Sequence, residues 1–121
     1  MTAPIEMNNA FFQDKLEKEK NTLTHRINQY ESEIKTSQTN ASADDIASDY
    51  EVRAKLKGLQ QIDQKRLSDV LGAIRRMNSG EYGECQTCFD DINPKRLESN
   101  PAALNCIECQ SKIDLKGKHF R

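Results

Sequence analysis

Apolar residues recur at helical spacing along two long stretches of this chain, and a polar segment separates them. The first stretch, from about residue 8 to 35, contains no Gly or Pro. Its apolar positions are three, four or seven residues apart, which puts them along one narrow stripe of a helix: Leu16, Leu23, Ile27, Tyr30 and Ile34. Lys20 falls on the same stripe, where a polar residue lowers stability and helps to fix the register of helix pairing.

The second stretch, residues 44–78, is again helical in period. Between the two stretches, residues 36–43 are small and polar, which predicts a loop. Ser79 and Gly80 are predicted to end the second helix, with the glycine in a left-handed conformation. The apolar residues of this second helix are Ile46, Tyr50, Val52, Leu56, Leu59, Ile62, Leu67, Val70, Leu71, Ile74 and Met77.

Two long helices with narrow apolar stripes bury them by pairing, either within one chain or between chains. The short connection favours pairing within the chain, because the partner helix is tethered and loop closure costs little entropy. We therefore expect a mainly α protein, a monomer built on a long antiparallel helical hairpin (coiled coil). Its expected parts are a flexible N-terminus (1–7), the hairpin (8–80) with a tip loop at about 36–44, a zinc finger (81–110) and a C-terminal helix (111–121).

Four cysteines, two CxxC pairs separated by seventeen residues, are all the cysteines of the chain: Cys85, Cys88, Cys106 and Cys109. This spacing is typical of a closed tetrahedral site for one structural zinc ion. Two disulfides are disfavoured because the chain begins without an export signal, and a thioredoxin-like pair is disfavoured because a helix and a glycine turn precede Cys85. A saturated zinc ion has no open position for a substrate, so we expect no enzyme.

Composition limits the other classes of protein. Only 36% of the residues are apolar, 31% are charged and tryptophan is absent, so one large core is excluded. No apolar run approaches the eighteen residues of a membrane span. A net charge of −1 argues against a nonspecific nucleic-acid binder, and an acidic finger with a tetrathiolate centre would repel phosphates. We expect a cytoplasmic protein that does not bind specific DNA sequences or membranes.

Charge is uneven along the hairpin. Acidic residues gather near the expected tip, among them Asp44 and Asp45, whereas the rest of the second helix is rich in Lys and Arg. A bland explanation for the acidic tip exists, because Ser42 and Asp45 match a capping box and carboxylates stabilise the first turn of a helix. The basic residues of this shaft that we consider candidate partner contacts are Arg53, Lys57, Lys65 and Arg66.

A helical hairpin with an acidic tip, followed by GEYGECQTC and then RLESNPAALNCIEC, resembles the DksA/TraR family of bacterial transcription factors. The resemblance implies that Gly83 and the four cysteines belong to a C4 zinc finger, with Arg96-Leu97 as its characteristic segment. It also implies binding to bacterial RNA polymerase, with the hairpin in the secondary channel and the tip near the active site. The family's tip pattern matches at Asp45 and Ala47, with Ser42 at its first acidic position and Asp44 adjacent.

The family's nucleotide-responsive members bind guanosine tetraphosphate through basic residues. The matching positions here are Ile62, Asp69 and Gln110, none of which supplies a cation. The resemblance thus implies a regulator of transcription initiation with weak or no response to this nucleotide, although Lys65 and Arg66 are close in sequence. A redox-responsive zinc thiol protein and a dimeric coiled-coil DNA-binding protein are the alternatives.

Overall fold

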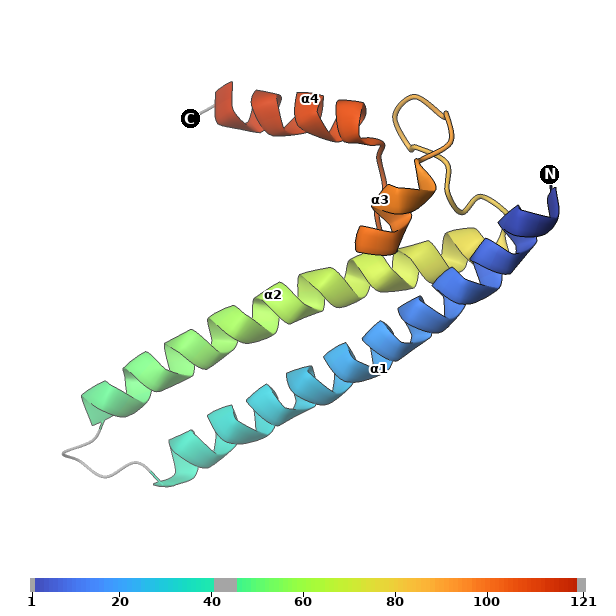
Figure 1. Cartoon of the computed structure of the whole chain (residues 1–121). Helices are drawn as coiled ribbons and strands as arrows, with labels where there is room; N and C mark the ends of the chain where they lie inside the picture. Colours follow the sequence, from blue (N-terminus) through green and yellow to red (C-terminus); the bar gives the residue numbers. More distant parts are fainter. Residues whose placement is uncertain (1, 41–45, 120–121) are drawn as a thin grey trace. The chain divides into compact units, whose positions relative to one another are not determined.

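Four helices make up the chain in a computed structural model that describes residues 2–40 and 46–119, with side chains for 9–36 and 49–116. They are α1 (Thr2–Asn40), α2 (Ile46–Asn78), α3 (Pro94–Ser99) and α4 (Ile107–His119) (Figure 1). The two long helices, α1 and α2, lie side by side and run in opposite directions. The expected mainly α fold with a helical hairpin and a short C-terminal helix is confirmed.

The first helix is longer than the sequence suggested. It begins at Thr2, where residues 1–7 were expected to be flexible, and it continues to Asn40, past the loop start expected at residue 36. Pro4 lies in the first turn, where a helix tolerates proline because the missing N–H has no partner there. The polar residues after Thr36 include no Gly or Pro, so loss of the apolar stripe does not end the helix. The tip residues Ser42, Asp44 and Asp45 lie outside the described residues, as does the side chain of Ala47.

Lys18–Ser68 form one compact unit, in which the two helices are joined by ion pairs as well as apolar contacts. Asp63 of α2 is only 6% exposed, and Arg26 of α1 donates to both of its carboxylate oxygens, from Nε at 2.8 Å and from Nη2 at 2.5 Å. In a second pair the charges are exchanged between the helices: Arg66 of α2 donates to both carboxylate oxygens of Glu19 on α1, at 2.5 and 2.9 Å. Such bidentate pairs fix orientation as well as distance, so they specify the register of the hairpin.

The apolar stripe of α1 is confirmed, since Leu16, Leu23 and Ile34 are buried. The stripe of α2 is narrower than its apolar residues suggested. Tyr50, Val52, Leu59, Ile62 and Leu71 are exposed. Val70 is buried as expected, and Asp63 and Ala73 are buried in the same row. A helix in a two-helix hairpin has one partner and therefore buries only one row of side chains, whichever residues that row contains.

Residues 1–17 and 69–121 form the second compact unit. Its core contains Phe12 of α1 together with finger residues, namely Cys85, Ile92, Leu97, Ala103 and Cys109. The Tyr82 hydroxyl donates to the Pro101 carbonyl oxygen at 2.7 Å, and burial raises the pKa of Tyr82 to about 12. In this unit the first turns of α1 and the zinc finger therefore share one small hydrophobic core.

Helix α2 ends as the sequence predicted. Gly80 has φ +81°, its N–H donates to the Met77 carbonyl, and the Glu81 N–H donates to the Arg76 carbonyl, which is the Schellman pattern. Helix α3 was not anticipated from the sequence. Asn93 is its N-cap, with Oδ1 accepting from the Lys95 N–H at 2.9 Å, and Pro94 occupies the first helical position.

The C-terminal helix begins four residues earlier than expected, at Ile107 instead of Ser111. The reason is local, because the second cysteine pair is itself the start of the helix. Gln110 N–H donates to the Cys106 carbonyl at 2.9 Å, which closes the first helical turn. Among the described residues, no helix combines the length and apolar character needed to cross a membrane.

Candidate metal centre

The first cysteine pair lies in a tight loop after α2. The loop is closed by hydrogen bonds from Cys85 N–H to the Asp90 carbonyl (2.8 Å) and from Phe89 N–H to the Cys85 carbonyl (2.9 Å). Within it, the Cys88 N–H points at the Cys85 sulfur, 3.5 Å away. Phe89 has a left-handed φ of +64°, a conformation that L-residues with a side chain rarely adopt. The backbone is thus folded around the sulfur of Cys85.

The second cysteine pair repeats this arrangement at the start of α4. Cys106 immediately precedes the helix, and its sulfur accepts from the Cys109 N–H at 3.5 Å. This is the geometry of an N-cap, with sulfur in place of the usual side-chain oxygen. Both loops therefore direct backbone N–H groups toward a cysteine sulfur, which favours the thiolate form.

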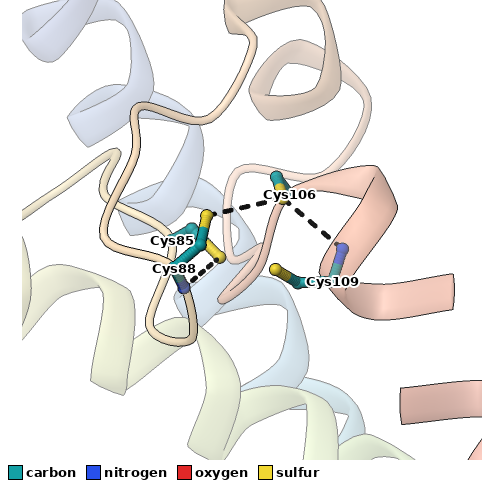
Figure 2. A group of neighbouring side chains, drawn as sticks. All are labelled: Cys85, Cys88, Cys106 and Cys109. Atoms are coloured by element: carbon teal, nitrogen blue, oxygen red, sulfur yellow. Dashed lines mark hydrogen bonds between the residues drawn. The ribbon is translucent and has the colours of Figure 1, made fainter. Parts of the chain in front are cut away.

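All four sulfurs converge on one point (Figure 2). They lie within 4.8 Å of one another, and the Cys88 and Cys106 sulfurs are 3.9 Å apart. A tetrahedral zinc site with Zn–S bonds of about 2.3 Å needs sulfurs about 3.8 Å apart. All four cysteines are free, and 3.9 Å is far from the roughly 2 Å of a disulfide. The residues fit one zinc ion held by Cys85, Cys88, Cys106 and Cys109, which leaves no position for a substrate.

The acidities of the thiols show why a cation belongs here. Burial raises the pKa of Cys85, but N–H groups of Cys88, Cys106 and Thr87 outweigh this and lower it to about 6. At Cys88 the Asp90 N–H lowers the pKa, while contact with Cys85 and burial raise it, and the net shift is upward. Contact with Cys106, burial and the other two sulfurs raise the pKa of Cys109 to about 12. Four thiolates at this separation repel one another, and a divalent cation removes that repulsion.

Two polar residues that the sequence analysis missed connect the cysteine pairs. Asn105, directly before Cys106, is 8% exposed. Its Oδ1 accepts from the Thr87 hydroxyl at 2.8 Å and lies 3.7 Å from the Cys85 sulfur, and its backbone carbonyl accepts from Arg96 Nε at 2.8 Å. An asparagine beside a CxxC pair carries no recognised spacing signal, so only the folded geometry reveals it.

The comparison with known families identifies this centre. Residues 80–114 match the family described as the prokaryotic dksA/traR C4-type zinc finger. The segment that contains all four cysteines is therefore similar to the DksA/TraR zinc finger. Arg96 and Leu97, the segment that the resemblance singled out, lie in α3, where Leu97 is buried in the core and Arg96 braces Asn105.

Relatives extend the similarity beyond the DksA/TraR finger. The chain is 28% identical over 111 residues to the RNA polymerase-binding transcription factor DksA of Buchnera aphidicola from Schizaphis graminum, covering 90% of this chain and 73% of the relative. The match to DksA of Escherichia coli K12 is 24% over 58 residues, 48% of this chain and 38% of the relative. The structure of transcription factor DksA2 from Pseudomonas aeruginosa superimposes with a TM-score of 0.86 at 29% identity, covering 94% and 88%. These relatives are transcription factors, which agrees with the expectation of a non-catalytic protein.

The remaining candidate residues belong to the tip segment and to α2. Asp44 and Asp45 at the tip lie outside the described residues, as does the side chain of Ala47. Of the basic shaft, Lys57 and Lys65 are exposed and Arg53 is half-buried. Arg66 donates to both carboxylate oxygens of Glu19 within the hairpin.

Proposed function

We propose that the protein is a non-catalytic regulator of transcription initiation that binds bacterial RNA polymerase in the cytoplasm. The observation that carries this proposal is the similarity along most of the chain, hairpin and finger together, to DksA of Buchnera aphidicola and to the Pseudomonas aeruginosa DksA2 structure. A shared finger alone supports only a shared metal site. Similarity that includes the hairpin also supports a shared role for the hairpin in binding RNA polymerase.

The hairpin would enter the secondary channel of the polymerase and bring its tip, with Asp44, Asp45 and Ala47, close to the active site. The hairpin unit, residues 18–68, suits insertion into a narrow channel. Its two helices bury their apolar stripes against each other and are joined by two bidentate ion pairs. Exposed Lys57 and Lys65 would complement acidic channel walls and steer entry. Regulation would then arise from the tip acting on the polymerase's own chemistry.

We further propose that guanosine tetraphosphate has little effect on this factor. Ile62, Asp69 and Gln110 occupy the positions where nucleotide-responsive relatives are expected to carry cations, and none of the three can pair with a phosphate as a cation does. The Gln110 amide also donates to Asp114 Oδ1 at 3.0 Å, and the Arg66 guanidinium is bound to Glu19. Both groups would have to leave these partners to contact a nucleotide.

Binding to purified bacterial RNA polymerase holoenzyme tests the proposal most directly. The full-length zinc-loaded protein should bind, and a Gre-type factor that occupies the secondary channel should compete with it. A fixed polymerase concentration and a series of competitor concentrations would give the displacement curve. Binding without competition would place the protein at another site on the polymerase, and no binding would remove the proposal altogether.

The tip is tested by Asp45→Asn, with Asp49→Asn as the matched control. Both substitutions remove one carboxylate near the start of α2 and keep a short polar side chain, so helix stability should change by no more than about 1 kcal/mol in each. Regulation of a responsive promoter at saturating protein should fall strongly for Asp45→Asn only, while polymerase affinity stays near that of the unaltered protein. Equal effects of the two variants would reduce Asp45 to a helix-capping residue.

The nucleotide proposal needs a polymerase that lacks its own separate guanosine tetraphosphate site. In that background, adding the nucleotide should leave the factor's effect on transcription almost unchanged. A strong enhancement would mean that Lys65 or other cations rebuild a phosphate site, and the correspondence at Ile62, Asp69 and Gln110 would be wrong.

A further inference from the structure

The side chain of Asn105 bridges the two halves of the metal centre. Its Oδ1 lies 2.8 Å from Thr87 Oγ1 and 3.7 Å from the Cys85 sulfur, both in the first cysteine loop. Its Nδ2 lies 3.5 Å from Oε1 of Gln110, in α4 next to the second pair. Cys85 has no exposed surface, and Asn105 is 8% exposed, so water has little access to the contact between them.

In this orientation the amide oxygen, which can only accept a hydrogen bond, faces the Cys85 sulfur. A cysteine that binds zinc is a thiolate, which has no proton to donate. An amide oxygen facing a buried thiolate places two acceptors against each other, without solvent to separate them. The contact between Oδ1 and the Cys85 sulfur is therefore unfavourable in the metal-bound protein.

We propose that Asn105 is a positioning residue of the zinc site, whose side-chain amide is turned by 180° in the metal-bound protein so that Nδ2–H donates to the Cys85 thiolate. A half-turn about the last side-chain bond exchanges Oδ1 and Nδ2 and leaves the rest of the residue in place. The two ends of an asparagine amide are nearly equal in shape, so the exchange needs no repacking. One residue adjacent to Cys106 thereby stabilises the charge on Cys85.

The other hydrogen bonds of the site are compatible with this turn. Nδ2 carries two hydrogens, so the second can be donated to Thr87 Oγ1, whose hydroxyl accepts as readily as it donates. Oδ1 then faces Gln110, whose half-exposed amide can turn in the same way and donate to it. The bond from Gln110 to Asp114 that this breaks is exposed, where water replaces it. The Asn105 backbone carbonyl keeps its bond from Arg96.

Asn105→Leu tests the proposal, with Thr87→Val as the matched control. Leucine has a similar volume and removes the donor, whereas Thr87→Val removes only the bond between Thr87 and Asn105. Both variants lose that bond, so the difference between them reports the contacts of the Asn105 amide with the Cys85 sulfur and with Gln110, and the cobalt spectrum below reports the sulfur contact by itself. If Nδ2 donates to Cys85, zinc affinity of Asn105→Leu should be at least about tenfold weaker than that of Thr87→Val, the range typical of groups that orient metal ligands. If Oδ1 faced the thiolate, leucine would remove a repulsion, and affinity would be equal or tighter.

Cobalt substitution supplies the second readout, on full-length protein loaded with Co²⁺ alone. A hydrogen bond to a thiolate lowers the energy of its electrons, so losing it should move the thiolate-to-cobalt charge-transfer absorption to longer wavelength in Asn105→Leu and not in Thr87→Val. An unmoved band in Asn105→Leu overturns the proposal whatever happens to the affinity, because a merely structural role weakens affinity alone. Gln86→Leu, an exposed position one residue from Cys85, should leave band and affinity unchanged, and a shift there would equally overturn it.

Discussion

Different interactions stabilise the hairpin unit, residues 18–68, and the zinc finger. In the hairpin unit, residues 18–68, stability comes from a repeated row of side chains along two helices and from two bidentate ion pairs that join them. In the finger, residues separated by as many as 24 positions converge on one point, and few apolar side chains surround it. A periodic element tolerates local change because its contacts repeat, whereas a metal centre depends on every ligand at once.

Removing the metal should therefore have the largest effect, and it should be confined to one region. In Cys106→Ser, or after chelation, the finger should unfold, because structural zinc supplies about 10–16 kcal/mol to such small domains. Amide hydrogen exchange should rise steeply across residues 82–110 and much less across 18–35 and 50–68. Re-adding zinc should restore the chelated protein but not the variant. A finger that stays protected without metal would contradict the comparison.

Acidity should weaken the metal centre next, and the direction follows from the thiols. Cys88 and Cys109 have raised pKa values, with that of Cys109 about 12, so both hold protons at pH 7 and must lose them when zinc binds. Cys85, with a pKa of about 6, is already a thiolate above that pH. Affinity should therefore rise with pH, by about tenfold per unit for each thiol that loses a proton when zinc binds. Competition against a chelator between pH 6.5 and 7.5 measures this, and a change of less than about tenfold across that range would contradict it.

In the hairpin, Arg26→Met should cost about 2 kcal/mol of unfolding free energy, because it leaves the buried Asp63 carboxylate without its partner. The side chain of Asp63 is 8% exposed and that of Arg26 is 47% exposed, so the loss is unequal for the two partners. Urea unfolding followed by circular dichroism, in excess zinc, would measure it. The effect on zinc affinity should be small, since both residues belong to the hairpin unit.

The control is the opposite truncation, Asp63→Leu. This substitution leaves Arg26 unpaired, but the side chain of Arg26 is already half-exposed to solvent. It also places an apolar side chain in the buried row of α2, so the unfolding free energy should stay the same or rise by about 1 kcal/mol. Equal losses in the two variants would mean that the ion pair contributes as a unit, and that burial of Asp63 does not decide its energetics.

The hairpin was largely predictable because the apolar residues of its helices recur at regular spacings in the sequence. Spacings of three, four and seven identified α1, and Gly80 identified the end of α2, since each rule depends only on neighbours in sequence. The buried row of α2 was not predictable from apolar residues alone. Asp63 occupies that row only because Arg26 lies opposite, and no pattern within α2 carries that information.

The metal centre was predictable in its ligands and not in its supporting residues. Doubled CxxC spacing identifies the four sulfurs because two residues between cysteines suffice to direct both at one ion. Asn105 and Thr87 are joined by a hydrogen bond between residues eighteen positions apart, and the left-handed Phe89 lies in a loop without the glycine that usually marks such a conformation. Helix α3 was within reach, because asparagine followed by proline is a known helix start as well as a turn.

A smaller effect should come from the strained turn of the finger. Phe89 has φ +64° and a ring that is 73% exposed, so its side chain gains little from burial while its backbone is strained. Phe89→Gly should relieve a cost of about 1 kcal/mol, which tightens zinc binding by about fivefold because folding of the finger and metal binding are coupled. Phe89→Ala keeps the strain and removes the ring, so its affinity should stay unchanged. Similar tightening in both variants would assign the effect to the ring.

The smallest effect concerns the reverse case in the hairpin, where a glycine occupies a position that favours a side chain. Gly58 lies inside α2, and a methyl group added there would meet no atom within 4 Å apart from its chain neighbours and the backbone of its own helix. Gly58→Ala should stabilise the hairpin by about 0.5 to 1 kcal/mol, because alanine restricts the unfolded chain and fits the helix without a clash. Urea unfolding in excess zinc measures the gain, and zinc affinity should not change.

Gly80→Ala provides the contrast, since φ +81° requires glycine at that helix end, and this variant should lose stability. A loss of stability in Gly58→Ala would mean that other atoms contact α2 at Gly58 in solution and leave no room for the methyl group.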